Sequence, residues 1–423
     1  MKVILSFIFL AVISTAFAQS ENYFEKNKAL RVDYFHSGNY QNESYAIDEL
    51  IEEPFWGGSW NFLIDSTGYG EYLIKVFDVA SDKLIFSHTF CALFDEWEFT
   101  AEAKITSRTF TETFVMPFPK NNVRIEFYSR NNNGVKEKKF EYTVDVHSYF
   151  IKKEKRFPFP VKDILISGDP SKKVDIVIIP EGYTADEMKR FEEDCREFGA
   201  GLFQYEPFKQ NKEKFNIRAV MAPSPESGAD EPGENIWKNT LLDCSYFTFD
   251  SDRYLMTYNN KMVRNIAANA PYDQIYILVN YSVYGGGSIY NYYSTDVNRN
   301  IMASQIFVHE FGHGFAGLAD EYDDGSTSYN DLYPLQTEPW EPNITTLVDF
   351  GGKWQDLLPA DIKIPTPPLT FDATTLGVYE GAGYVAKGIY RPTPDCMMRS
   401  FSDQLFCPVC TRAIEKMIDL YTR

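Results

Sequence analysis

The chain has 423 residues, of which 44% are hydrophobic and 24% charged, and its formal net charge is −19. This composition excludes a disordered chain, because the apolar content and the length suffice to bury the cores of two or three domains. The acidic charge argues against nucleic acid or anionic lipid as a partner, because both repel a negative surface.

The first residues, MKVILSFIFLAVISTAFAQS, have the pattern of a cleavable secretory signal. Lys2 precedes a short apolar run, and small residues at Ala16 and Ala18 close it. A membrane anchor is the weaker alternative, because the run falls short of the roughly 20 residues that a spanning helix needs. We therefore expect a signal peptide over 1–18 and a protein that is secreted, periplasmic or at the cell surface, without stable membrane insertion. We also expect this protein to be a monomer.

Residues 19–150 predict an N-terminal β-sandwich domain that folds separately and lies outside the candidate metal site of the second domain, which is described below. Apolar and polar residues alternate in short segments, and turn residues such as Asn131 to Gly134 separate them, which is typical of a sandwich. The expected strands are 72–78, 83–88, 104–116, 122–128 and 138–145. A charged stretch with two prolines then predicts a linker over 151–162.

Residues 163–423 predict a second domain with a different pattern. Apolar runs rich in β-branched residues favour buried strands, and Thr184 with Glu187 fits the capping box of a helix. Strands are expected at 174–180, 216–221 and 274–280, and helices from 184, at 261–270, through 303–308 and at 411–421. This alternation indicates an α/β or α+β domain around a mixed sheet.

The segment His309-Glu310-Phe311-Gly312-His313 carries the strongest functional signal. A helix places residues four apart on one face, so the two imidazoles can hold one zinc ion. Glu310 stands beside the first ligand and can act as the general base towards the hydrolytic water. A chance match is the alternative, and the apolar, helix-compatible residues before the motif argue against it.

A third zinc ligand is expected from a carboxylate, because the other three of the five histidines all precede the second domain. Gly317 can end the helix in a left-handed conformation, which would let the chain turn back and present Asp320 to the metal. Asp320 is our first choice, Glu321 the second and a distant acid the third. The continuation over 323–325 suits a solvated loop or a calcium site equally well.

Two further segments are candidates for completing the site. Residues 283–290 are rich in glycine and predict a strand that a substrate backbone could extend, with a flexible hairpin loop as the alternative. Residues 395–400 contain Met397 and Met398 and predict a methionine turn beneath the metal, with Met398 favoured. Ordinary core packing is the alternative for both methionines.

The six cysteines belong to a chain with an export signal, which permits disulfides. Cys407 and Cys410 form a CxxC pair of the redox or zinc-binding kind, but the sequence holds no second pair. We therefore expect a disulfide between Cys396 and one member of this pair.

These residues resemble a known family. The segments HEFGHGFAGLADEY, VDIVIIPEGYTADEM, DCMMRS and FCPVC are similar to zinc metallo-endopeptidases grouped with the clostridial immunoglobulin A peptidase. The resemblance covers about 165–423, and the preceding β region is similar to that family's N-terminal domain. It implies an α+β protein in which a β-sandwich precedes a metzincin-like zincin domain with a mixed sheet.

Carried onto this chain, the family pattern makes His309 and His313 zinc ligands, Glu310 the base and Asp320 the third ligand. Gly317 and Asp320 each stand one residue later than in the usual metzincin pattern, and the third ligand is not histidine. The resemblance does not make immunoglobulin A the substrate of this chain.

The resulting expectation is a secreted zinc endopeptidase that acts on polypeptides, with host or dietary proteins as candidate substrates. Two alternatives stay open: a non-catalytic surface or glycan-binding protein, and a zinc amidase acting on cell-wall peptide. Glu310 argues against the first alternative, because a binding module does not need a catalytic base.

Overall fold

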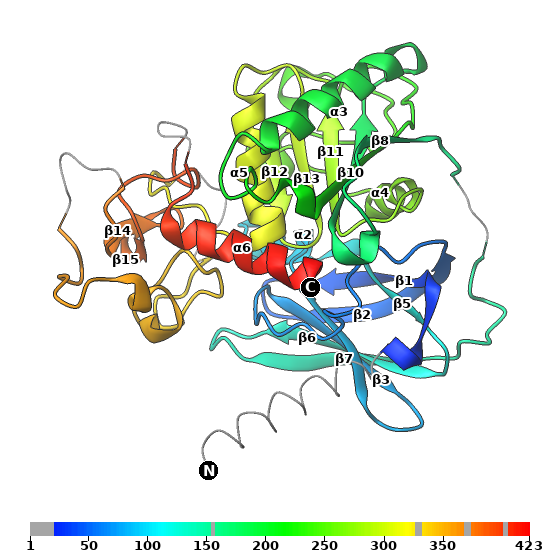
Figure 1. Ribbon diagram of the computed structural model, residues 1–423, viewed down its shortest axis with the longest axis horizontal. Coiled ribbons are helices and arrows are strands. Elements are labelled where there is room, and N and C mark those ends of the chain that lie inside the picture. The colour runs from blue at the N-terminus through cyan, green and yellow to red at the C-terminus, as the bar shows by residue number, and fades with distance from the viewer. Residues whose placement is uncertain (1–20, 154–156, 326–331, 368–373, 401–404) are drawn as a thin grey trace.

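The computed structural model describes residues 21–153, 157–325, 332–367, 374–400 and 405–423, so the expected signal peptide lies outside the described residues. A β-sandwich, a larger domain of helices around a mixed sheet and a small C-terminal lobe make up the molecule (Figure 1). None of the helices in these ranges combines the length and the apolar character that a membrane crossing requires.

The N-terminal domain is an antiparallel β-sandwich, as the sequence predicts. One sheet has the order β2-β1-β5 and the other β4-β3-β6-β7. The strands are β1 (Phe24–Gly38), β2 (Glu43–Glu53), β3 (Tyr72–Asp78), β4 (Leu84–Phe90), β5 (Arg108–Pro119), β6 (Val123–Arg130) and β7 (Lys136–Val144), with a short helix α2 (Leu93–Glu98) after β4.

Aromatic side chains fill the space between the two sheets. The ring of Phe127 in β6 lies 5.0 Å from Tyr34 in β1 and 5.9 Å from Phe114 in β5, measured between centroids. Such edge-to-face pairs are favourable beyond the area they bury. The apolar residues that alternate with polar ones along these strands therefore form the core of the sandwich, as predicted.

The second domain contains a mixed six-stranded sheet with the order β12-β13-β11-β9-β10-β8. The four central strands are parallel, and the edge strands β8 and β12 are antiparallel to their neighbours. The bounds are β8 (Val161–Leu165), β9 (Val174–Glu181), β10 (Phe215–Val220), β11 (Gln274–Val279), β12 (Gly286–Ile289) and β13 (Tyr293–Val297). Every residue of β9 and β11 is buried, as expected for parallel strands covered on both faces.

Helices cover both faces of this sheet. Helices α3 and α5 pack together on one face, with α6 beside α5, and α4 lies on the opposite face, towards the sandwich (Figure 1). Their bounds are α3 (Met188–Leu202), α4 (Asn260–Ala267), α5 (Ala303–Ala316) and α6 (Pro408–Thr422). The predicted capping box precedes α3, where the Thr184 backbone N–H donates to the Glu187 carboxylate at 2.9 Å.

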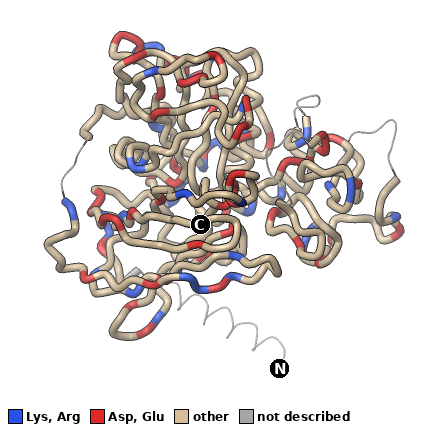
Figure 2. The backbone as a smooth tube through the Cα atoms, turned by 180° about the vertical axis from the view of Figure 1, so that it is seen from behind, with Lys and Arg blue, Asp and Glu red and all other residues tan. Residues whose placement is uncertain are grey.

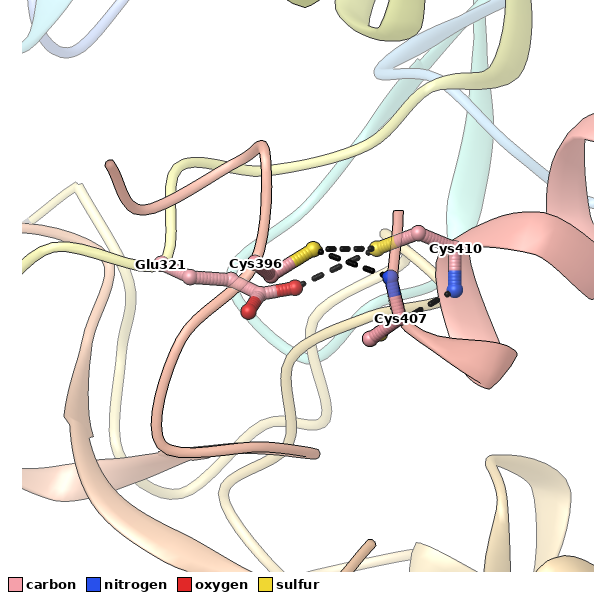
Figure 3. Close-up of side chains that lie close together, drawn as sticks. All are labelled: Glu321, Cys396, Cys407 and Cys410. Atoms are coloured by element: carbon pink, nitrogen blue, oxygen red, sulfur yellow. Dashed lines mark hydrogen bonds between the residues drawn. The ribbon is translucent and has the colours of Figure 1, made fainter. Parts of the chain in front are cut away.

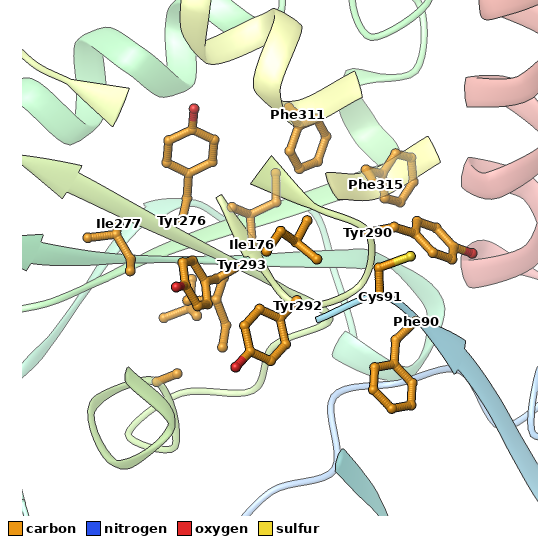
Figure 4. Close-up of a cluster of buried hydrophobic side chains, with 14 of the residues drawn as sticks. Phe90, Cys91, Ile176, Tyr276, Ile277, Tyr290, Tyr292, Tyr293, Phe311 and Phe315 are labelled. Carbon is orange, nitrogen blue, oxygen red and sulfur yellow. The ribbon is translucent and has the colours of Figure 1, made fainter. Parts of the chain in front are cut away.

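The sandwich and the second domain share one hydrophobic core. Figure 4 shows this core running from Phe311 and Phe315 of α5 through the sheet to Phe90 and Cys91 of the sandwich. The Cys91 N–H donates to the Tyr290 carbonyl at 2.9 Å, which joins the two domains through their backbones. The boundary over 151–162 stays a prediction, although β8 already begins at Val161.

The C-terminal lobe contains the hairpin of β14 (Tyr379–Ala382) and β15 (Val385–Arg391) and lies beside the end of α5 (Figure 1). It has a small core of its own, formed by Ala319, Ile344, Ala382 and Ile389. The lobe therefore rests on the segment that follows α5.

Short 3-10 helices lie in the connections: η1 (Glu21–Tyr23), η2 (Glu102–Lys104), η3 (Pro170–Lys172), η4 (Ala185–Glu187), η5 (Lys212–Lys214), η6 (Pro232–Glu234), η7 (Thr248–Asp250), η8 (Phe350–Gly352) and η9 (Gln355–Leu357). Seen from behind, acidic and basic positions are interspersed over both domains (Figure 2).

Candidate active site

Helix α5 presents His309 and His313 side by side on the lining of a large cleft. Their Nε2 atoms lie 3.0 Å apart, and the Nδ1 atoms point away from each other. Nδ1 of His309 contacts the Met397 carbonyl at 3.0 Å, and Nδ1 of His313 contacts the Leu318 carbonyl at 2.5 Å. A carbonyl accepts only from a protonated nitrogen, so this arrangement leaves both Nε2 lone pairs available to a metal.

Gly317 ends α5 in the left-handed conformation that the sequence predicts, with φ 62° and ψ 35°. Its N–H donates to the His313 carbonyl at 3.0 Å. A Cβ at this position would lie 2.7 Å from a ring carbon of Trp340, so the backbone conformation and the space both favour glycine. The chain reverses here and returns towards the two histidines.

This reversal brings Asp320 to the histidines. Its Oδ1 lies 3.2 Å from Nε2 of His309 and 3.3 Å from Nε2 of His313, yet accepts no hydrogen bond of good geometry. Donors bound to a tetrahedral zinc at about 2.0–2.1 Å lie roughly 3.3 Å apart. The three atoms therefore have the spacing of three corners of a zinc site, and their donor types fit zinc.

The other oxygen of Asp320 is held by the C-terminal lobe. The Tyr384 hydroxyl donates to Oδ2 at 2.6 Å, and the Gly383 N–H donates to the Asp320 carbonyl at 3.0 Å. Gly383 and Tyr384 form the tip of the β14–β15 hairpin, where both have positive φ, 56° and 68°. This two-residue turn is the type that suits a hairpin, although tyrosine rarely adopts it. No motif in the sequence predicts this partner.

Glu310 lies between the histidines in sequence and faces the same cleft. Loss of solvent raises its pKa, the charge of Asp320 raises it further, and the two histidines oppose this effect. For His313, burial lowers the pKa, but the charge and hydrogen bond of Asp320 raise it to about 9. Glu310 is therefore a carboxylate whose proton affinity is increased where a base is needed.

The cleft has a volume of about 1890 Å³ and is lined by all three parts of the molecule. The edge strand β12 runs along it, so the predicted glycine-rich segment is a strand rather than a flexible loop. A Cβ on Gly286 would lie 3.6 Å from Oε1 of Glu310. Glu71 and Glu96 of the sandwich also line the cleft, although the sandwich contributes none of the three converging ligand atoms.

The predicted methionine turn packs against α5. Met397 and Met398 are both fully buried. Met397 contributes its carbonyl to His309, and the sulfur of Met398 lies 3.0 Å from the position of a Cβ on Gly312. The segment therefore supports the helix that carries the motif, with both methionines involved.

Glu321, our second choice for the third ligand, points away from the histidines. Its Oε1 accepts hydrogen bonds from Asn343 Nδ2 at 2.9 Å and from the Cys410 thiol at 3.2 Å. The side chain of Asp323 pairs with Arg399 at 3.2 Å. Neither Asp323 nor Asp324 belongs to a group of potential metal ligands among the described residues.

The predicted disulfide is wrong in this structure, because all six cysteines are free thiols. The sulfurs of Cys396 and Cys410 lie 3.7 Å apart, well beyond a disulfide bond of about 2.05 Å. The expected pair is instead part of a group of four, which Cys407 and Glu321 complete. Sequence spacing could not indicate this group, because its members come from three separate segments.

Comparison with known proteins supports the resemblance seen in the sequence. The family model described as IgA Peptidase M64 matches residues 163–373 and 368–418. The model described as Peptidase M64 N-terminus matches residues 19–141. No curated protein gave a significant match. The matches cover both domains, and the chain belongs to the IgA peptidase M64 family of metallopeptidases.

Proposed function

We propose that this protein is an exported zinc-dependent endopeptidase. The family supports peptidase activity, and one observation supports the metal and the mechanism. Nε2 of His309, Nε2 of His313 and Oδ1 of Asp320 converge in a cleft of about 1890 Å³ that Glu310 also lines. Zinc bound there supplies a Lewis acid that polarises a peptide carbonyl and makes water more acidic.

The protein's own residues would position and move the proton. Met397 and Leu318 fix the two imidazole rings through their carbonyls, and Tyr384 fixes the Asp320 carboxylate. Glu310 would accept a proton from the attacking water and return it to the leaving amine. A raised pKa suits this exchange, because it makes Glu310 a stronger proton acceptor than an ordinary carboxylate.

An extended polypeptide fits the edge strand β12. On the side away from β13, the backbone of Gly286 forms hydrogen bonds with the segment 253–255. The Gly286 carbonyl accepts from the Leu255 N–H, and the Gly286 N–H donates to the Arg253 carbonyl. In an antiparallel strand the backbone N–H and carbonyl groups of alternate residues point to the same side, so those of Ser288 face the same outer side as those of Gly286. We expect a substrate backbone to pair at Ser288, two residues along β12 from the Gly286 position that lies close to Glu310.

Export rests on the sequence pattern over 1–18 and is tested by N-terminal sequencing of protein recovered from the medium or periplasm. A mature terminus near Gln19 is expected. An intact Met1 on all of the exported protein would contradict signal cleavage.

The activity is tested by incubating zinc-loaded protein with a mixed peptide library and with peptidoglycan. Cleavage at internal bonds of the library peptides, abolished by chelation and by Glu310→Gln, is the expected result. Cleavage of peptidoglycan alone would indicate the amidase instead. Absence of cleavage in both substrates, with zinc bound, would favour a non-catalytic binding protein.

A further inference from the structure

A second cluster of metal-ligand types lies directly behind the candidate active site. It consists of Glu321, Cys396, Cys407 and Cys410, whose ligand atoms all lie within 4.8 Å of one another. Glu321 follows Asp320, Cys396 precedes Met397, and the two remaining cysteines begin α6. Figure 3 shows the sulfurs of Cys396 and Cys410 and the Glu321 carboxylate pointing towards one another from these separate segments. All four side chains are buried.

The spacing of the sulfurs suits a shared metal rather than a covalent bond. Cys396 Sγ and Cys410 Sγ lie 3.7 Å apart. Two thiolates bound to a tetrahedral zinc at about 2.3 Å stand roughly 3.8 Å apart. The chain thus brings three sulfurs and one carboxylate oxygen within 4.8 Å of one another, and four is the number of ligands in a closed structural zinc site.

The surrounding polar groups are arranged for negatively charged sulfur. The Cys407 N–H points to Cys396 Sγ at 3.3 Å, and the Cys410 N–H points to Cys407 Sγ at 3.4 Å. Cys407 also caps the N-terminus of α6, where the helix dipole favours a thiolate. These contacts would stabilise metal-bound thiolates, since thiols are weak acceptors.

Glu321 gives independent evidence for a bound cation. It is fully buried, and its Oε2 has no hydrogen-bond partner, although Oε1 has two. A buried carboxylate oxygen without a partner is costly unless a cation or metal satisfies it.

We propose that Glu321, Cys396, Cys407 and Cys410 bind a second, structural zinc ion. Thiolates select soft or borderline metals, and a carboxylate as fourth ligand favours zinc over copper(I). The four ligands leave no open position for substrate, so this zinc serves the fold.

The second zinc would also position the active site. Asp320 is the neighbour of Glu321, and the Met397 carbonyl that holds His309 follows Cys396 directly. The Glu321 N–H donates to the Met398 carbonyl at 2.8 Å, which joins the two segments. A metal in the cluster would therefore tie both segments to α6. This role rests on the proposed function, whereas the metal site itself does not.

The wild-type protein gives the first test. Metal analysis after zinc loading should find two zinc ions per chain. Replacement by cobalt should produce the near-ultraviolet thiolate-to-cobalt charge-transfer absorption, which His309, His313 and Asp320 cannot give. One zinc per chain, absence of that absorption, or a disulfide within the cluster of the zinc-loaded protein would overturn the proposal.

Variants separate the two sites. Cys410→Ala should lose one zinc and the thiolate absorption, and should weaken zinc binding by the active site by about 10–100-fold, as loss of an orienting partner does. Cys195→Ala is the matched control, because Cys195 is an equally buried helical cysteine outside the cluster. His313→Ala should lose one zinc and keep the absorption.

The outcomes distinguish this inference from the proposed function. Two zinc ions with thiolate absorption but no peptide cleavage would leave the structural site standing and overturn the peptidase mechanism. Peptide cleavage with one zinc and no thiolate absorption would support the peptidase mechanism and overturn the structural site. If Cys410→Ala does not fold, the cobalt spectrum of the wild-type protein still decides the question.

Discussion

Asp320 and Glu321 are neighbours in the chain, yet their carboxylates face two clusters with opposite properties. Asp320 lies with His309 and His313, whose side chains are 12% and 15% exposed and line the large cleft. Glu321 lies with three sulfurs in a fully enclosed position. A reactive metal site needs an open position and a nearby base, whereas a structural site needs neither. Access and donor type therefore distinguish the two clusters more clearly than sequence position does.

The same loops carry residues of both clusters. Successive side chains of an extended segment point to opposite sides, so the short loop after Gly317 can serve both clusters at once. The segment of Cys396 and Met397 also serves both clusters, because the Cys396 side chain faces the sulfurs and the Met397 backbone carbonyl contacts His309. Movement of either loop would change both clusters together.

The largest effect is expected from Glu310, the proposed base. Glu310→Gln should lower kcat by about 10²–10⁴-fold, because the amide cannot accept the proton from water. Metal content should stay at two zinc ions per chain, since Glu310 belongs to neither cluster. Peptide cleavage and metal analysis on the same preparation measure both quantities. Turnover within a few-fold of wild type would remove Glu310 from this role.

Two alanine variants test whether Asp320 and Glu321 have different roles. Asp320→Ala should lose active-site zinc and peptidase activity while it keeps the thiolate-to-cobalt absorption. Glu321→Ala should weaken or lose the absorption while the zinc of His309 and His313 stays bound, with affinity reduced by about 10–100-fold. Equilibrium zinc titration with spectroscopy would measure both. The opposite pattern would exchange the roles of the two carboxylates.

A smaller effect is expected from the tyrosine that holds Asp320. Tyr384→Phe removes the hydroxyl that donates to Asp320 Oδ2 at 2.6 Å but keeps the ring. Loss of such an orienting partner usually costs about 10–100-fold in metal affinity or activity. Tyr379→Phe in the same hairpin is a suitable control, because its hydroxyl contacts the Thr375 carbonyl instead. Equal behaviour of both variants would argue against orientation of Asp320 by Tyr384.

The sequence predicts helix α5 well because its signal is local. The spacing of His309 and His313 specifies one face of a helix, and Gly317 specifies where the helix ends. The group of Glu321 with three cysteines was missed, because it depends on contacts between segments about 75 residues apart in the chain. The same limit hides Tyr384, which reaches Asp320 only through the fold of the C-terminal lobe.

In the sandwich, β3 is predicted with its observed bounds, whereas β1 and β2 are not predicted at all. Strand β3 alternates strictly between buried and half-buried residues. Strand β1 instead buries both faces, and its outward face carries Arg31 and Asp33, which are 1% and 0% exposed. Arg31 donates to Asn265 of α4 at 2.9 Å, so these charges are buried between the domains. A pattern based on solvent exposure cannot recognise such a strand.

The smallest effect on metal binding is expected at His36, a buried histidine of the sandwich that provides a contrast with the two clusters. Its Nδ1 lies 3.2 Å from Glu112 and its Nε2 lies 3.1 Å from Glu43, so carboxylates satisfy both nitrogens without a metal. Burial lowers the pKa of His36, but the two carboxylates raise it to about 9. Burial raises the pKa of Glu43, but His36 lowers it to about 2.

The sign of the pH dependence follows from these shifts. The charged form of His36 stabilises the fold fully below its unfolded pKa of about 6.5, and this contribution is lost as the pH rises through 9. The contribution of Glu43 is present above about pH 4.5 and is lost only as the pH falls towards 2. Between pH 6.5 and 9 the free energy of unfolding should therefore fall by an amount on the order of a few kcal/mol. His36→Gln should flatten this slope without changing metal content, as denaturant titrations of zinc-loaded protein at several pH values would measure. An equal slope in the variant would show that the protonation of His36 does not cause the pH dependence. Loss of a zinc ion would show that His36 takes part in metal binding, as His309 and His313 are proposed to do.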